Sequence, residues 1–172
     1  MIIRISVFVL LAFLVTACGV NAAINTDIDK VASATEEIVD FDLPAGYSPE
    51  FSGKLFSYTL VSYNPGDGQS HLYLIQTEKE SDGDKLANMI GQIVPGPYDP
   101  QTRMTIIETR SITVREQEAT MVISDGINSE GNPYRQIMVA FQGNGGPALI
   151  TFSEPVTRWN QEKVDAFIAS IH

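Results

Sequence analysis

The sequence has a single cysteine, Cys18, and two histidines, His71 and His172. One cysteine cannot close an internal disulfide, and these three residues are too few for a zinc site or a Cys/His catalytic pair. His71 begins an apolar run beside a turn, and we interpret it as a surface residue of an edge strand. No serine lies in a Gly-x-Ser-x-Gly motif, and there is no phosphate-binding loop or dinucleotide fingerprint. The sequence therefore indicates neither an enzyme nor a cofactor.

Basic residues are also scarce. The chain has 11 Lys and Arg against 21 Asp and Glu. The first 17 residues contain Arg4 and no acidic residue, so a chain that starts at Cys18 has 11 − 1 = 10 basic and 21 acidic residues, a net charge of −11. This sign disfavours binding to nucleic acid and electrostatic binding to anionic lipid. The remaining 172 − 17 = 155 residues suit one domain with its own core.

The sequence lacks an apolar run long enough to cross a membrane. Residues 5–15 are apolar except for Ser6, whereas a membrane-spanning helix needs about 20 apolar residues. The run follows Arg4 and ends in small residues, as a secretory signal does. Val15-Thr16-Ala17-Cys18 resembles the lipobox of bacterial lipoproteins. An ordinary signal that leaves Cys18 as a free thiol is the alternative, and an uncleaved membrane helix is a weaker one.

The lipobox resemblance implies cleavage before Cys18, with residues 1–17 as signal peptide and a diacylglyceryl group on the cysteine sulfur. We therefore expect a lipid-anchored protein of the bacterial cell envelope. Gly19 stands where sorting rules look for an inner-membrane aspartate, so its presence implies the periplasmic side of the outer membrane if the cell has two membranes. Residues 18–35 are small, polar and weakly patterned, which predicts a flexible tether. A first helix packed on the domain is the alternative.

Residues 36–172 show strand patterns separated by turn signals. Alternation predicts a half-buried strand over 38–43, and β-branched and aromatic residues predict one long strand over 54–63. Further strands are expected at 71–77, 103–114, 119–124, 135–141 and 148–152, mostly as an antiparallel meander.

Two helices are expected. Leu86, Ile90, Ile93 and Val94 share one helical face, with Asp82 or Asp84 as its cap. A terminal helix capped by Thr157 or Asn160 should present its apolar face to the sheet, formed by Val164, Phe167, Ile168 and Ile171. The expected fold class is therefore α+β, a single domain with an antiparallel sheet of about six or seven strands flanked by helices.

Three short segments resemble the PsbP-like α/β/α sandwich domains of bacterial envelope proteins. They are Phe41-Asp42-Leu43-Pro44-Ala45-Gly46-Tyr47, the hairpin over 112–119, and the closing helix over 159–171. The hairpin lacks the glycine on which such hairpins commonly turn. The resemblance implies an antiparallel sheet flanked by helices and a non-enzymatic accessory or binding role.

Two acidic loops could hold calcium, which prefers oxygen ligands. One offers Glu80, Asp82 and Asp84; the other offers Asp125, Asn128 and Glu130. Neither has the spacing of a known calcium loop, so a plain turn or helix cap is the alternative for both. Four aromatic residues could line a surface groove instead of entering the core: Tyr47, Tyr58, Tyr98 and Trp159.

Three functions follow from these observations. The first is a non-enzymatic, protein-binding or accessory subunit held to the membrane through Cys18, which predicts a contiguous apolar or aromatic surface patch. The second is a lipoprotein that binds a small ligand or calcium. The third is a hydrolase with two facing carboxylates.

Overall fold

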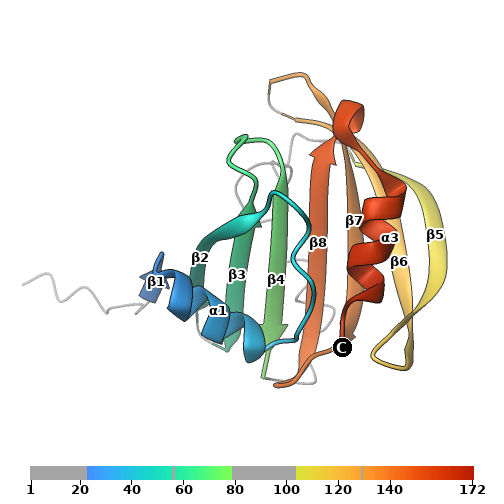
Figure 1. The fold of residues 1–172 in the computed structure, drawn as a ribbon. Helices are drawn as coiled ribbons and strands as arrows, with labels where there is room; N and C mark the ends of the chain where they lie inside the picture. Colours follow the sequence, from blue (N-terminus) through green and yellow to red (C-terminus); the bar gives the residue numbers. More distant parts are fainter. Residues whose placement is uncertain (1–22, 56, 79–103, 129) are drawn as a thin grey trace, which may run out of the picture.

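The computed structural model describes residues 23–55, 57–78, 104–128 and 130–172. Its centre is one antiparallel sheet of eight strands in the order β1-β2-β3-β4-β8-β7-β6-β5 (Figure 1). The strands are β1 Ala23–Asn25, β2 Ser48–Leu55, β3 Tyr58–Asn64, β4 His71–Thr77, β5 Thr105–Val114, β6 Gln117–Ile127, β7 Pro133–Gln142 and β8 Pro147–Pro155.

Two α-helices, α1 (Ile28–Glu36) and α3 (Gln161–Ala169), lie on the same face of this sheet (Figure 1). The short 3₁₀ helix η2 (Val156–Arg158) links β8 to α3. The side chain of Asn160 caps α3 by accepting a hydrogen bond from Lys163 N. The predicted apolar face of α3 is buried as expected: Val164, Phe167, Ile168 and Ile171. The α+β class is therefore confirmed, whereas the helix expected after residue 84 lies outside the described residues.

The sheet has more strands than predicted because the stretch 54–63 is a hairpin and not one long strand. The chain reverses between Leu55 and Tyr58, which face each other in the β2–β3 pairing. No glycine, proline or asparagine marks this reversal in the sequence. A continuous β-branched and aromatic pattern therefore concealed the turn.

The segment predicted as a flexible tether is the second source of extra structure. Residues 23–25 form β1, which pairs with β2, and residues 28–36 form α1. Val31 is fully buried, and Thr35 Oγ1 lies 2.5 Å from Tyr63 Oη in a buried hydrogen bond. The tether prediction is wrong for this part of the chain because Val31 and Thr35 give α1 a face that packs on the sheet.

Residues 38–43 form no strand, which corrects another prediction. The segment runs over the helix-bearing face between α1 and α3 (Figure 1). Its backbone is bound from outside the sheet: Asn144 N donates to Ile38 O at 2.8 Å, and His172 N donates to Asp40 O at 3.0 Å. Asp42 N donates to the hydroxyl of Ser170 at 3.0 Å. Because these partners satisfy the backbone, the segment needs no neighbouring strand.

The sheet separates two hydrophobic clusters. The larger lies under the helices and includes Phe152, which is fully buried on β8. The smaller contains Tyr58, Tyr73, Ile75 and Leu149. Because Leu149 and Phe152 differ by an odd number of positions along β8, their side chains point to opposite faces of the sheet.

The β5–β6 hairpin turns on two residues that rarely adopt its geometry. Arg115 and Glu116 both have positive φ, 53° and 63°, as a type I′ turn requires. An L-residue with a side chain pays roughly 1–2 kcal/mol in this region, whereas glycine does not. Since glycine also costs roughly 0.5–1 kcal/mol in backbone entropy, we expect Glu116→Gly to raise the free energy of unfolding by about 0.5–1 kcal/mol.

Urea unfolding measures this effect. Glu118→Gly, two residues on inside β6, is the matched control and should lower stability, since glycine weakens a strand interior. A Glu116→Gly midpoint at or below the parent value would contradict the assigned turn strain.

Candidate functional site

The exposed large apolar residues gather at the two edges of the sheet. In the described part of the chain, Ile24 is 69% exposed and Ile28 65%, at or beside edge strand β1. At the opposite edge Ile106 is 65%, Ile107 46% and Ile127 57% exposed. Val156, on η2, is the remaining one. We call the first pair, Ile24 and Ile28, the β1 corner. We call strand β5 together with the exposed Ile127 of β6 the β5 edge.

The β5 edge presents a long run of backbone. In the part of the chain that the structure describes, β5 pairs with β6 alone and ends the sheet. The first five residues of this ten-residue strand are exposed. A register shift between Ile106 and Glu108 places a bulge at Ile107, a device that bends an edge and limits indiscriminate pairing. Beyond the bulge, residues 108–114 pair with β6 in a regular register.

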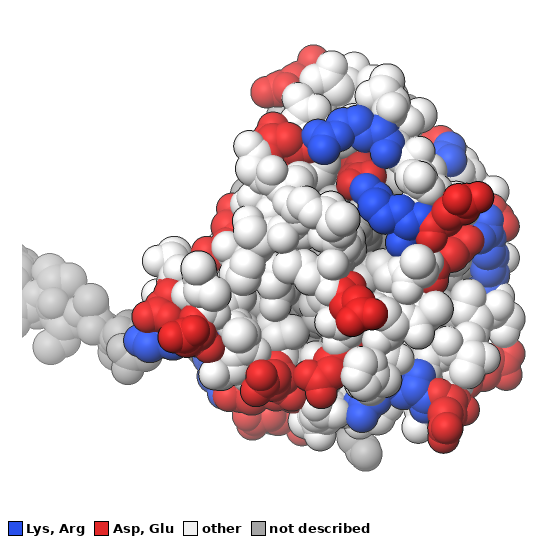
Figure 2. All heavy atoms as spheres, viewed as in Figure 1, with Lys and Arg blue, Asp and Glu red and all other residues white. Residues whose placement is uncertain are grey.

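Paired charges flank this edge. Arg110 donates to Glu108 at 2.5 and 3.0 Å, and lies 3.6 Å from Asp165 of α3. The hydrogen bond from Arg110 holds the pKa of the Glu108 carboxyl below its usual range, so Glu108 stays ionised. Figure 2 shows basic and acidic side chains next to one another on this side of the helix-bearing face. The edge therefore carries both signs of charge.

Asp125, within β6, and Asn128 and Glu130, in the loop after it, make hydrogen bonds to neighbouring groups of the protein. Arg135 donates to both oxygens of Asp125 at 2.7 and 2.9 Å. Asn128 Oδ1 accepts from the backbone N–H groups of Glu130 and Asn132. Within the described ranges, no group of three or more His, Cys, Asp or Glu residues could hold a metal ion. The other candidates, Glu80, Asp82 and Asp84, lie outside those ranges, as does Tyr98.

The remaining aromatic candidates do not line one groove. Tyr47 is buried against Phe152, with ring centroids 5.4 Å apart, and Trp159 also packs against Phe152, at 6.1 Å. Tyr58 is buried in the cluster on the opposite face of the sheet. Tyr47 and Trp159 therefore belong to the helix-side core, which was the alternative interpretation, and Tyr58 is separated from them by the sheet.

A buried carboxylate that sequence reasoning missed lies beside this core. Glu154, near the end of β8, is only 1% exposed. Its Oε1 accepts from the Tyr47 hydroxyl at 3.0 Å and from the Lys163 ammonium group of α3, while its Oε2 is buried with no hydrogen-bond partner within the described chain. Burial, and then the charge of Glu154, raises the pKa of Tyr47 above its usual value. Glu154 thus faces a lysine and a tyrosine, and not the second carboxylate that the hydrolase hypothesis requires.

His71 lies on a central strand, which corrects its interpretation as an edge-strand residue. β4 pairs with β3 and β8, and His71 faces Ser153 in the register. Its ring stacks on Tyr73 at 5.5 Å, and burial lowers its pKa, so it is neutral at pH 7. It lines a cavity of about 120 Å³ with Ser153, Tyr134 and the loop after β6. Because β4 pairs with β8, which is distant in the sequence, His71 lies within the sheet and not at its edge.

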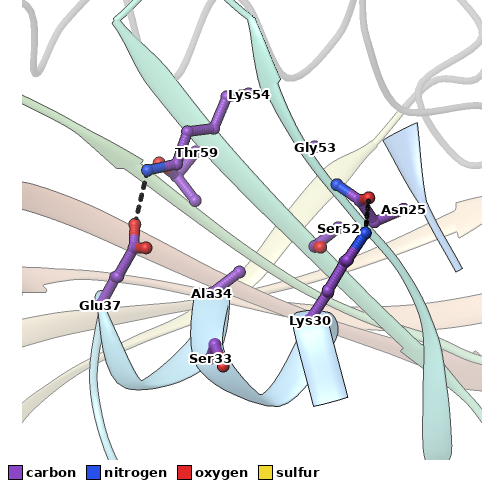
Figure 3. A pocket seen from close by; sticks show the side chains of 9 residues that line it. All are labelled: Asn25, Lys30, Ser33, Ala34, Glu37, Ser52, Gly53, Lys54 and Thr59. Carbon is purple, nitrogen blue, oxygen red and sulfur yellow. Dashed lines mark hydrogen bonds and ion pairs between the residues drawn. The ribbon is translucent and has the colours of Figure 1, made fainter. Parts of the chain in front are cut away.

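A larger cavity of about 290 Å³ lies between α1 and strands β1–β3 (Figure 3). Lys54 pairs with Glu37 at 2.7 Å across it, and Lys30 Nζ donates to Asn25 Oδ1 at 3.4 Å. Hydroxyls of Ser33, Ser52 and Thr59 complete its polar lining. Because its charged groups already have partners, the cavity shows no strong preference for an anion or a cation.

No known protein family matches this chain, and neither does any curated protein. No helix within the described residues is long and apolar enough to cross a membrane.

Proposed function

We propose that this protein is a lipid-anchored, non-enzymatic domain of the bacterial cell envelope that binds a protein partner through the β5 edge. The observation that carries the proposal is the β5 edge itself, a ten-residue terminal strand with Ile106 and Ile107 exposed, next to the exposed Ile127 of β6. Exposed apolar residues beside unpaired backbone are typical of partner sites.

The lipobox supports the anchor. Cys18 lies five residues before Ala23, where β1 begins, so the lipid would join the chain close to the β1 side of the domain. β5 is separated from β1 by seven strand spacings, or roughly 34 Å at about 4.8 Å each. An anchor at Cys18 therefore leaves the β5 edge free. If the cell has two membranes, the domain faces the periplasm from the outer membrane.

The chemistry of the β5 edge favours a partner with an extended segment. Such a segment adds to a sheet edge through backbone hydrogen bonds and gains specificity from alternate side chains. Glu108 and Arg110 would meet a partner strand that carries both charge signs. The net charge of −11 for residues 18–172 makes a nucleic-acid partner unfavourable.

We also propose that the fold is PsbP-like. The Pro44-Ala45-Gly46 turn supports this proposal, since Gly46 has φ of 87° and Tyr47 N donates to Pro44 O at 3.0 Å. The closing helix α3 packed on an antiparallel sheet is consistent with it.

The cavity between α1 and the sheet favours a second candidate, a lipoprotein that binds a small ligand. Its volume of about 290 Å³ suits a small molecule with both polar and apolar parts. Binding there would require rearrangement of the Lys54–Glu37 pair.

Crosslinking in intact cells tests the proposed function. The tagged full-length protein is compared with Cys18→Ala, which lacks the anchor, and with the double variant Ile106→Asp/Ile127→Asp. We expect a recurrent crosslinked protein that requires both Cys18 and the β5 edge. Val156→Asp, at an exposed apolar residue outside both edges, is the matched control and should keep the crosslink.

Equal recovery of the same proteins from all four versions would refute a partner at this edge. A crosslink to a second copy of the chain would show that the β5 edge mediates self-association and not binding to a different protein. Circular dichroism spectra must agree among the versions, so that lost crosslinking reports the surface and not unfolding.

A further inference from the structure

We infer that the β1 corner rests on the lipid surface and fixes the orientation of the domain. This inference rests on the proposed anchor at Cys18 and adds a second contact to it. The partner is a bilayer surface, and the contacting residues are Ile24 and Ile28.

The short chain between the anchor and the sheet limits how far the β1 corner can lie from the bilayer. Residues 19–22 are the only ones between Cys18 and Ala23, so the two Cα atoms lie at most about 18 Å apart in any conformation. A tether over residues 18–35 would instead have reached roughly 60 Å. Because β1 and α1 are packed on the domain, the β1 corner must stay near the bilayer surface.

The second step is the position of the two isoleucines. Ile24 faces Gly53 in the β1–β2 pairing, so its side chain points to the sheet face away from α1. Ile28 is the first residue of α1, which lies on the other face of the sheet. It precedes the buried Thr35 by seven positions, about two helical turns, so both lie on the same side of α1. β1 and the start of α1 form one extreme of the domain (Figure 1). An apolar residue on each side of this edge suits shallow insertion at a lipid surface.

The acidic residues around the β1 corner disfavour an electrostatic contact with anionic lipid. Asp27 and Asp29 flank Ile28, and Lys30 is the single basic residue between residues 23 and 30. Figure 2 shows further acidic side chains over α1. The contact is therefore apolar, and zwitterionic lipid is its appropriate surface. An anchor that holds the corner at high effective concentration makes a weak contact sufficient.

The experiment uses the lipidated full-length protein in phosphatidylcholine vesicles. Cys18 is the only natural cysteine and is blocked by lipid, so a cysteine introduced at residue 24, 28 or 106 takes one fluorescent label. Nitroxide-labelled phosphatidylcholine then reports proximity to the bilayer by quenching. We expect at least twofold more quenching at residues 24 and 28 than at residue 106.

A second variant separates a specific contact from mere closeness. With the label at Lys30→Cys, the change Ile24→Asp/Ile28→Asp should reduce quenching at least twofold while the protein remains in the vesicle fraction. Equal quenching at residues 24, 28 and 106 would overturn the inference while leaving the anchor intact. Full-length protein that does not partition into vesicles would instead refute the anchor.

Discussion

Replacing Lys163 by methionine is expected to lower the free energy of unfolding by about 3 kcal/mol, because it leaves a buried carboxylate without its cation. Glu154 is only 1% exposed, and the variant would leave it with the Tyr47 hydroxyl as hydrogen-bond donor. The methionine keeps the aliphatic packing of the lysine side chain, so the loss reports charge and not volume. Urea unfolding at pH 7 of the Cys18→Ala protein, which carries no lipid, provides the measurement.

Two comparisons isolate the cause. The double variant Glu154→Gln/Lys163→Met removes both charges and should recover most of the lost stability. Lys54→Met breaks an exposed pair, with side chains 59% and 52% exposed in Lys54 and Glu37, and should cost less than about 1 kcal/mol. If Lys163→Met costs no more than Lys54→Met, the loss of Lys163 does not leave an unpaired buried charge at Glu154.

The second large effect is expected at Phe152, which lies at the centre of the helix-side core. Its side chain is fully buried, and three rings pack around it: Tyr47 at 5.4 Å, Phe167 at 6.0 Å and Trp159 at 6.1 Å. Phe152→Ala should lower the free energy of unfolding by about 3–5 kcal/mol, since it loses buried apolar area and opens a cavity. Thermal or urea unfolding of the Cys18→Ala protein, which carries no lipid, measures this loss.

Ile127→Ala serves as the control, because Ile127 is also a large apolar strand residue but is 57% exposed. Its cost should stay within about 0.5 kcal/mol. Phe152→Leu should fall between the two, because leucine fills part of the space of the ring. Equal losses for Phe152→Ala and Ile127→Ala would show that the core is not organised around Phe152.

Local signals in the sequence were sufficient for several elements. A cap at Thr157 or Asn160 and the apolar spacing of Val164, Phe167, Ile168 and Ile171 predicted α3, and the structure confirms the helix, with Asn160 as its cap. Proline and glycine in Pro44-Ala45-Gly46 favour a turn after the apolar residues 38–43, and the structure contains that turn. These predictions succeeded because a cap, a helical face and a tight turn depend on residues only a few positions apart.

Other predictions failed where the partner of a segment is distant in the sequence. Residues 38–43 alternate like a strand, but the C-terminal residues Ser170 and His172 bind their backbone. Residues 28–35 belong to the stretch 18–35 that was predicted as a tether, but the buried Thr35 binds Tyr63 of β3. No local sequence pattern indicates which residues distant in the chain will pack against a segment.

The candidate site shows the same division. The sequence by itself determined the acidic charge, the alternation of the strands and the resemblance of residues 15–18 to a lipobox, because each depends on composition or on neighbouring residues. Only the tertiary structure decided that β1 and β5 are the edge strands, since pairing of β4 with β8 joins segments about 75 residues apart in the chain. That non-local pairing placed His71 inside the sheet and Glu154 beside Lys163, and it left the isoleucines of both edges exposed.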